Sequence, residues 1–158
     1  ARGPEYVRTV VECYKEAIRS YLDGTFTDEK KEAWDVRLKT VFNRGFWNGY
    51  YLGQRLGEWS RNYGSEATER KVYVGKVTNF YKKISVAEVL VEAAPLEVAD
   101  EIFFLGATTG VAEQKLEELH GPDGEVTRRV EQGQLCAIRT TELIRRGDQL
   151  YKFEPTDN

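Results

Sequence analysis

The spacing of apolar residues changes from a helical period to a strand period near residue 70. Before that point, apolar residues recur every three or four positions, as they do on one face of an α-helix. From residue 71 onward, short runs rich in β-branched residues partly alternate with polar residues and are separated by turns. The sequence therefore predicts an α+β protein, with an N-terminal helical segment followed by a small antiparallel β-barrel.

The first predicted helix is amphipathic and about 20 residues long. It begins at Pro4, because proline fits the first helical position, and it stops before Gly24, which can adopt the left-handed conformation that ends a helix. Its apolar residues are Val7, Val10, Val11, Tyr14, Ala17, Ile18, Tyr21 and Leu22. The charged residues lie on the opposite face.

A second helix is expected to begin after Thr27, a residue that caps helices, and to end near Asn43. Its apolar stripe is narrower, and two helices alone cannot enclose a core. We therefore expect residues 1–60 to form a helical segment whose apolar faces are covered by another body. The polar residues 61–70 are expected to form a linker.

Residues 71–158 are expected to form a closed barrel of six or more short strands. The runs that predict strands are 71–77, 84–92, 101–106, 134–139 and 149–153, with two shorter strands around the turn at 121–124. Short strands separated by turns favour a closed β-barrel over an open sheet, because closure removes unpaired edges.

The composition argues against several classes of protein. With 23 Lys and Arg against 26 Asp and Glu, the formal net charge of −3 gives no strong overall attraction to nucleic acid or anionic lipid. No apolar run approaches the ~20 residues that a membrane-spanning helix needs, so no membrane partner is expected. Cys13 and Cys136 lie too far apart for a disulfide scaffold or a metal-ligand motif, and we therefore expect a cytoplasmic protein.

The chain contains no methionine, not even at position 1. Because translation begins with methionine, we expect that the chain has been processed or is a fragment of a longer protein. Any function inferred from this sequence is then part of the function of a longer protein.

No set of residues in this sequence predicts catalysis. Acyl transfer needs a nucleophile, a base beside it and a group that orients the base. The single histidine, His120, lies at a turn and is expected to be solvated, whereas Cys13 and Cys136 are expected to be buried and inert. Residues 117–118 are both glutamate, but neighbours in a strand face opposite ways, which indicates a surface pair. We therefore predict no catalytic, cofactor-binding or metal-binding residue.

One glycine- and aromatic-rich segment, residues 43–53, supplies candidate contact residues. These candidates are Arg44, Phe46, Trp47, Tyr50 and Tyr51. One interpretation is a packed connector whose aromatic rings are buried on a neighbouring body. The other is a surface that stacks on a base or ring, with the arginine as an anion contact. The packing interpretation is favoured, because aromatic residues carry much of the area of any interface.

Three segments in the first third of the chain share a pattern. They are residues 4–11, residues 14–17 and residues 43–53, the last reading Asn-Arg-Gly-Phe-Trp-Asn-Gly-Tyr-Tyr-Leu-Gly. Together they resemble the C-terminal part of peptidase family U32, the collagenase-like family, in which these motifs follow an N-terminal TIM-type barrel. The resemblance covers roughly residues 4–53 and implies that the barrel, with its own cysteine motifs, is missing here. Neither Cys13 nor Cys136 matches those cysteines, so no cluster ligand is carried over.

A second resemblance covers residues 74–81, 95–102 and 145–151. These segments resemble the second domain of elongation factor Tu-type GTPases, which is a six-stranded antiparallel barrel. Ala99 stands where that module usually has glycine. In those GTPases the module helps to hold tRNA. Residues 71–158 carry 11 Lys and Arg against 15 Asp and Glu, a net charge of −4, which argues against a strong phosphate-binding face.

The resemblance implies that the chain is a C-terminal accessory or substrate-binding region of a U32-type peptidase and is not catalytic by itself. Residues 1–60 would pack on the missing TIM-type barrel, and the terminal β-barrel would bind or orient a substrate. The alternative is an RNA-binding accessory domain of a U32-type enzyme that hydroxylates tRNA or rRNA. No cofactor is expected in this stretch, and any iron–sulfur cluster or metal would belong to the missing barrel. The expected partners are that barrel, a peptide or RNA substrate, and a second copy bound through the helical segment.

Overall fold

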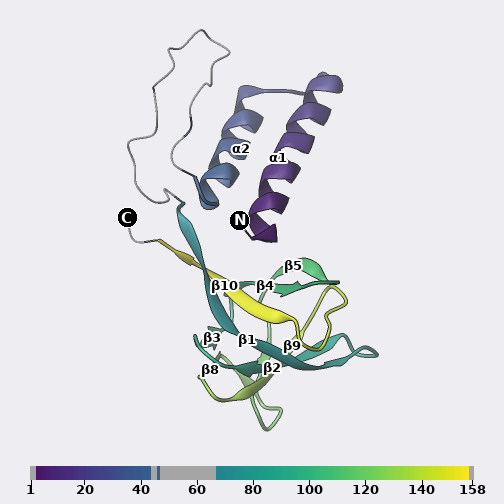
Figure 1. Ribbon diagram of the computed structural model, residues 1–158, viewed down its shortest axis with the longest axis vertical. Coiled ribbons are helices and arrows are strands. Elements are labelled where there is room, and N and C mark those ends of the chain that lie inside the picture. Colours follow the sequence, from purple (N-terminus) through teal and green to yellow (C-terminus); the bar gives the residue numbers. More distant parts are fainter. Residues whose placement is uncertain (1–2, 44–45, 47–66, 157–158) are drawn as a thin grey trace. The chain divides into compact units, whose positions relative to one another are not determined.

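The computed structural model describes residues 3–43, 46 and 67–156, and the chain divides into two compact units (Figure 1). The first, residues 1–70 with 155–158, is called the helical unit here. The second, residues 71–154, is called the β unit. Residues 61–66 of the predicted linker lie outside the described residues.

Helix α1 (Pro4–Leu22) has the bounds that its sequence predicts. Proline occupies the start of the helix, and Gly24 follows its end with a φ of +65°. The N–H of Thr25 donates to Ser20 O (2.8 Å), and the N–H of Gly24 donates to Tyr21 O (3.1 Å). These two bonds satisfy carbonyls that the end of the helix would otherwise leave unpaired, which is why glycine is needed at this position.

Helix α2 (Asp28–Thr40) begins at the predicted cap, because the N–H of Lys30 donates to Thr27 Oγ1 (3.3 Å). Polar contacts join α2 to α1. Glu16 Oε2 accepts from Trp34 Nε1 (2.9 Å) and from Arg37 Nη1 (2.6 Å), and these donors lower the pKa of the Glu16 carboxyl. Little apolar surface is shared between the helices, since Cys13 and Ser20 are the buried residues of α1 and α2 has none.

Ten strands are described in the rest of the chain. They are β1 (Glu69–Tyr81), β2 (Val86–Val91), β3 (Leu96–Glu97), β4 (Glu101–Gly106), β5 (Gly110–Lys115), β6 (Leu119–His120), β7 (Val126–Thr127), β8 (Arg129–Val130), β9 (Leu135–Arg139) and β10 (Gln149–Pro155). Eight form one sheet in the order β5-β4-β10-β1-β2-β9-β6-β7, and β3 pairs with β8 (Figure 1). Each strand pair whose register is described is antiparallel, so the predicted α+β class and antiparallel sheet are confirmed.

The sheet differs from the predicted closed six-stranded barrel, because no described strand pairing joins its end strands β5 and β7. A side chain bridges β5 to the end of β9 instead. Gln114 Nε2 donates to Arg139 O (2.8 Å), and the N–H of Thr141 donates to Gln114 Oε1 (3.1 Å). Among the described residues, one side-chain amide thus joins β5 to the end of β9 at this seam, where no strand pairing is described.

The core of the β unit is built from residues that alternate along its strands. It includes Val74, Val77, Val89, Leu96, Phe104, Leu119, Ile138, Ile144 and Leu150, all essentially inaccessible to solvent. Gly75 lies among them because a Cβ atom there would come within 1.9 Å of the carbonyl oxygen of Leu90 on the paired strand. The core therefore fixes both the side chains and the close approach of β1 and β2.

The turn that leads into β4 keeps the geometry of a glycine turn although alanine occupies it. Ala99 has a φ of +79°, in the left-handed region that favours glycine. Its N–H donates to Leu116 O (2.7 Å), and Asp100 Oδ2 accepts from the N–H of Glu97 (3.0 Å). The surrounding hydrogen bonds hold Ala99 in this conformation.

Candidate docking and binding surfaces

The cysteines are buried, as their sequence context predicts. Cys13 and Cys136 are each 2% exposed. Desolvation raises the pKa of both thiols, that of Cys136 to about 12. Because the thiolate is the reactive form, neither cysteine is poised as a nucleophile.

His120 is held by two partners rather than simply solvated. Its Nδ1 lies 3.1 Å from Gly124 O and its Nε2 lies 2.5 Å from Glu118 Oε1. Both contacts favour the protonated ring, and they raise the pKa of His120, the Gly124 carbonyl having the larger effect. With both ring nitrogens engaged in this way, the imidazole has no free nitrogen to act as a base. Among the described residues, no group of three or more His, Cys, Asp or Glu is arranged to hold a metal ion.

The predicted contact residues fall mostly outside the described part of the chain. Arg44, Trp47, Tyr50 and Tyr51 lie outside it. Phe46 is described, and it is 53% exposed. These residues therefore remain predictions as a contact surface.

An exposed apolar stripe along α1 is the most prominent surface feature of the helical unit. It consists of Val7, Val11, Tyr14, Ile18, Tyr21 and Leu22, which are 47% to 76% exposed. We call this set the α1 stripe. The sequence pattern had identified these residues as apolar, but it could not tell which of them α2 would cover. The sequence signal for this exposed face is that two series of apolar residues alternate along α1, one facing α2 and the other facing away from it.

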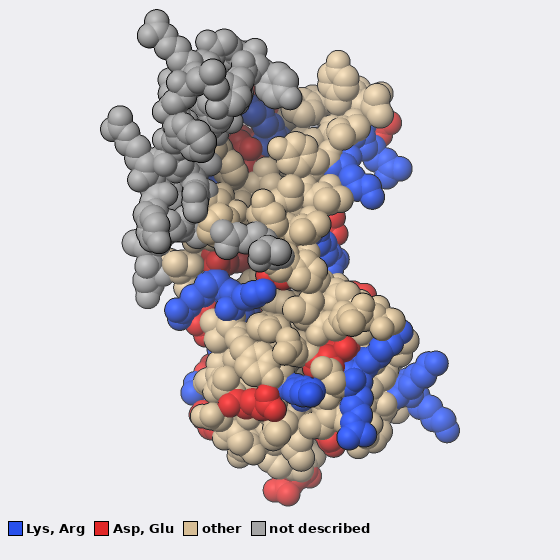
Figure 2. Space-filling model, viewed as in Figure 1, with Lys and Arg blue, Asp and Glu red and all other residues tan. Residues whose placement is uncertain are grey.

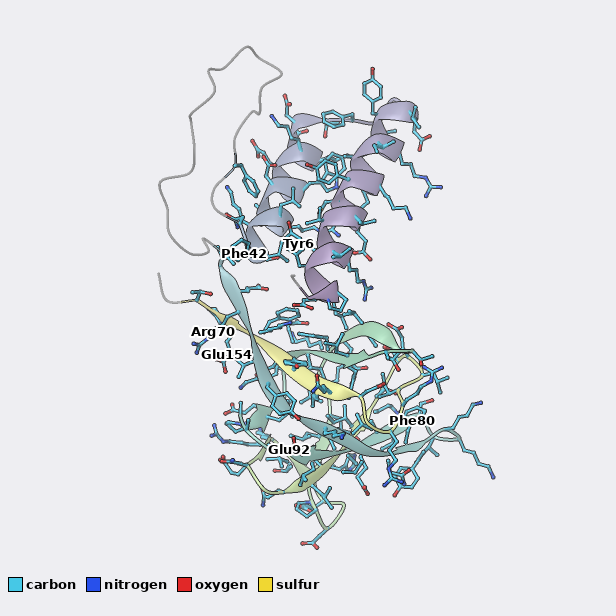
Figure 3. All side chains as sticks on the ribbon, in the orientation of Figure 1. Tyr6, Phe42, Arg70, Phe80, Glu92 and Glu154 are labelled. Carbon is cyan, nitrogen blue, oxygen red and sulfur yellow. The ribbon has the colours of Figure 1, made fainter. Side chains whose placement is uncertain are left out.

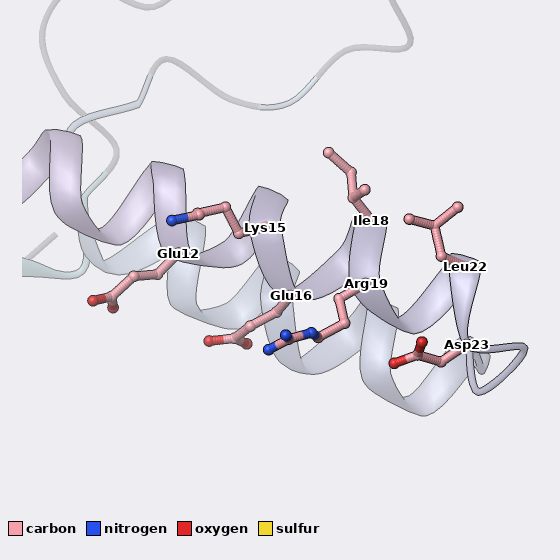
Figure 4. Close-up of a pocket in the computed structure, with 7 residues that line it drawn as sticks. All are labelled: Glu12, Lys15, Glu16, Ile18, Arg19, Leu22 and Asp23. Carbon is pink, nitrogen blue, oxygen red and sulfur yellow. The ribbon is translucent and has the colours of Figure 1, made fainter.

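A hollow of about 630 Å³ borders the α1 stripe near the C-terminal end of the helix (Figure 4). It is lined by Glu12, Lys15, Glu16, Ile18, Arg19, Leu22 and Asp23. Charged side chains thus stand beside the apolar ones, an arrangement typical of the rim of a protein interface.

The β unit has a cationic end, which its net negative charge conceals. Residues 76–83 and 139–146 together hold six Lys and Arg and one Glu, whereas residues 97–131 hold three Lys and Arg and nine Asp and Glu. Figure 2 shows Lys and Arg side chains gathered on one side of the β unit. Sequence reasoning summed the charge over the whole unit and so missed this segregation.

Backbone contacts bring the two basic segments together. Val86, just past the β1–β2 turn that carries Lys82 and Lys83, pairs with Arg139. The N–H of Thr140 donates to Ser85 O (2.8 Å), and the N–H of Gly147 donates to Val77 O (2.9 Å). We call the exposed cations Lys82, Lys83, Arg139, Arg145 and Arg146 the cationic end. Figure 3 labels Phe80, which lies near the β1–β2 turn.

Exposed apolar side chains accompany these cations. They are Tyr81, Ile84 and Leu143, which are 45%, 58% and 47% exposed. Asp148 anchors the loop beneath them, since its Oδ2 accepts from Thr109 Oγ1 (2.6 Å) and from the N–H of Arg145 (2.9 Å). The surface therefore combines positive charge with an aromatic ring on a fixed loop.

A second aromatic cluster lies on the outer side of β1, β4 and β10. The rings of Phe103 and Tyr151 stack at 5.2 Å, and Tyr73 meets Tyr151 edge-on at 5.4 Å. Tyr73 donates to Glu92 Oε2 (2.5 Å), and burial together with this contact raises the pKa of Tyr73 to about 12. We interpret this cluster as packing, because Phe103 is fully buried.

None of the described helices is long and apolar enough to cross a membrane.

Comparison with known proteins identifies relatives over most of the chain. Residues 1–61 match the model of peptidase family U32. A protein named Collagenase from Porphyromonas gingivalis is 50% identical over 154 residues, which are 98% of this chain and 37% of that protein. An uncharacterized protease of Methanocaldococcus jannaschii is 33% identical over 161 residues, covering 99% of this chain and 38% of that protein. The chain therefore spans about two fifths of the length of the curated relatives it matches.

A solved structure described as the C-terminal domain of a Geobacillus thermoleovorans U32 peptidase is 17% identical, with a TM-score of 0.48 over 51% of this chain and 90% of that one. The relationship to this family is therefore based on the sequence matches and not on this structural similarity. The first 61 residues match peptidase family U32, and nearly the whole chain is similar to a region of a protein named Collagenase and of an uncharacterized protease.

Proposed function

We propose that this chain is a non-catalytic, C-terminal accessory region of a U32-family peptidase. The helical unit docks on the catalytic part, for which the family resemblance implies a TIM-type barrel, and the β unit binds or orients the substrate. The observation that carries the proposal is the exposed α1 stripe.

The stripe supports docking because it exposes apolar area that a free surface helix would not keep. Fully burying one such side chain contributes about 1.5–3 kcal/mol, so six half-exposed residues represent a substantial unused driving force. The curated relatives are more than twice as long as this chain, and their additional polypeptide could cover the stripe.

The chemistry of the described residues supports a non-catalytic role. Both thiols have raised pKa values, and the histidine is occupied on both nitrogens. Peptide hydrolysis needs a nucleophile or activated water with a base beside it, and the described part of the chain offers no such pair.

The test compares three proteins on gelatin and casein: the isolated chain, the intact P. gingivalis relative, and that relative without the region aligned with this chain. We expect the isolated chain to be inactive. Removal of the aligned region should reduce turnover of gelatin more than turnover of a short peptide, because the lost contacts bind the large substrate. Peptidase activity of the isolated chain that is abolished by Cys136→Ser or His120→Asn would refute the proposal.

A second candidate function, RNA binding by the β unit, is favoured by the cationic end. Basic side chains beside an exposed tyrosine suit phosphates and a stacked base. Affinity for single-stranded RNA should then fall steeply with salt, and Lys82→Glu with Lys83→Glu should lower the slope of log K against log salt by roughly one per lost phosphate contact. Lys115→Glu, an exposed lysine among acidic residues, is the matched control. RNA affinity that does not depend on salt, or that Lys115→Glu changes equally, would exclude this function.

A further inference from the structure

Helix α1 carries two apolar series with the same spacing. The series toward α2 is Tyr6, Val10, Cys13, Ala17 and Ser20, and the exposed series is Val7, Val11, Tyr14, Ile18 and Tyr21. In both, successive residues are alternately four and three positions apart. At about 100° per residue, the two series are offset by roughly a third of a turn around the helix.

Apolar residues spaced alternately four and three positions apart form the contact face, or seam, between two packed helices. It repeats every 3.5 residues, so that each side chain enters a hole formed by four residues of a facing helix. The series toward α2 already contacts a helix, since Lys30 Nζ of α2 donates to Ser20 Oγ (3.3 Å). The exposed series keeps the same repeat over about four turns and offers a packing face for a second helix.

We infer that the α1 stripe receives an amphipathic α-helix with carboxylates on its flank, supplied by the polypeptide that the relatives have beyond the region shared with this chain. That polypeptide makes up more than half of their length. The inference rests on the proposed function and specifies the element that covers the stripe, so that α1 becomes the middle helix of a three-helix layer.

The charge beside the stripe specifies the flank of the incoming helix. Lys15 occupies the position next to the seam on its solvent side, where interhelical ion pairs form, and Arg8, which pairs with Glu12 (2.9 Å), occupies the equivalent position seven residues earlier. Arg19 and Lys15 line the neighbouring hollow together with three carboxylates, Glu12, Glu16 and Asp23 (Figure 4). Two of these, Glu12 and Glu16, are already paired with Arg37 of α2. A helix with Glu or Asp at its own flanking positions complements these cations.

A second copy of α1 does not offer this complement. In a parallel pair, Lys15 would face Val10 or Ala17 of the other copy, and in an antiparallel pair it would face Arg8, Lys15 or Leu22. Neither arrangement places a carboxylate opposite Lys15. The spacing and the flank charge together favour a different helix.

Hydrogen exchange on the intact P. gingivalis relative and on the isolated chain tests the inference. Amides aligned with residues 7–22 should exchange at least about 10-fold more slowly in the intact protein than in the isolated chain. Aspartate at the positions aligned with Val11 and Ile18 should remove this difference and should deprotect one helical segment elsewhere in the protein. Each substitution alone should weaken docking by about 10-fold or more, as expected for one buried aliphatic side chain.

Two controls keep the outcomes distinct. Val36→Asp changes an equally exposed aliphatic residue of α2 that lies off the stripe, and it should alter nothing. Circular dichroism of the isolated Val11→Asp/Ile18→Asp chain should be unchanged, because both residues are exposed.

If the deprotected segment is a strand or a loop, the inference is wrong while the proposed docking stands. If the stripe is covered by a second copy in a dimer that the same substitutions dissociate, both the inference and the docking on the catalytic part are wrong. If α1 is no better protected in the intact protein than in the isolated chain, the inference and the proposed docking both fail.

Discussion

The two units of this chain bury apolar surface to very different extents. The β unit encloses a continuous core in which Phe104, Leu119 and Ile138 are fully buried. In the helical unit, α1 buries only Cys13 and Ser20, and α2 buries nothing. The β unit thus has its own source of stability, whereas the helices are held largely by polar contacts at Glu16 and Arg37. The described part of the helical unit thus has regular secondary structure but little core, and we expect its stability to depend on further contacts.

Removing a core side chain from the β unit should have the largest effect on stability. Phe104→Ala is expected to lower its free energy of unfolding by about 3–5 kcal/mol, whereas Tyr14→Ala, which truncates an exposed ring, should cost less than about 0.5 kcal/mol. All three tryptophans precede residue 60, so fluorescence follows the helical unit and circular dichroism of the strands follows the β unit in urea. Equal losses for the two variants would contradict the contrast between the units.

Each unit contains one cysteine, which allows their opening to be compared in a single sample. Cys13 and Cys136 are equally inaccessible, so each must be exposed by local unfolding before it reacts. We expect iodoacetamide to label Cys13 at least about 100-fold faster than Cys136 under native conditions, because the helical unit opens at a lower free energy. Mass spectrometry of the quenched protein measures both rates. Similar rates would show that the units open together.

Replacing alanine in the left-handed turn should stabilise the β unit slightly. The left-handed conformation of Ala99 costs about 1–2 kcal/mol, and glycine avoids that cost but adds about 0.4–1 kcal/mol of unfolded-state entropy. Ala99→Gly should therefore raise the free energy of unfolding by up to about 1.6 kcal/mol. Ala93→Gly, at a position without positive φ, should lower it, and a gain there as large as at Ala99 would refute the explanation.

The smallest expected effect is a pH dependence centred on the only histidine. The contacts of His120 with Gly124 O and Glu118 raise its pKa above the ordinary 6.5, so the protonated ring stabilises the β unit. That stabilisation is complete below the unfolded-state pKa and is lost as the pH rises through the folded-state pKa. NMR titration of the single imidazole should give a pKa above 6.5 that Glu118→Gln lowers. A pKa at or below 6.5 in the native chain would contradict these contacts.

The sequence was sufficient for most elements of the fold because their signals are local. Pro4, Gly24 and Thr27 mark the helix ends, alternation marks β2 and β9, and a continuous apolar run marks β4. Strand β5 was missed, since Gly110 and the charged residues that follow it give it little apolar alternation. The open seam was missed because it depends on one side chain, Gln114, that meets residues far along the chain.

The candidate surfaces were harder to predict than the fold for a related reason. The residues of the α1 stripe were recognised as apolar, but which of them α2 leaves exposed depends on how the two helices are rotated against each other. The cationic end arises from two segments about 60 residues apart that strand pairing brings together. Of the predicted contact residues, Phe46 is exposed, and the role of that segment stays a prediction.

The Gln114 seam has a consequence for how this sheet responds to a substitution. Where strands are joined by a ladder, an added residue shifts the register of every following pair and turns core side chains outward. Across the seam, the two bonds of the Gln114 carboxamide join β5 to the end of β9 without fixing a ladder register. Replacing Gln114 therefore loosens the contact between β5 and the end of β9 without shifting the register of any paired strand.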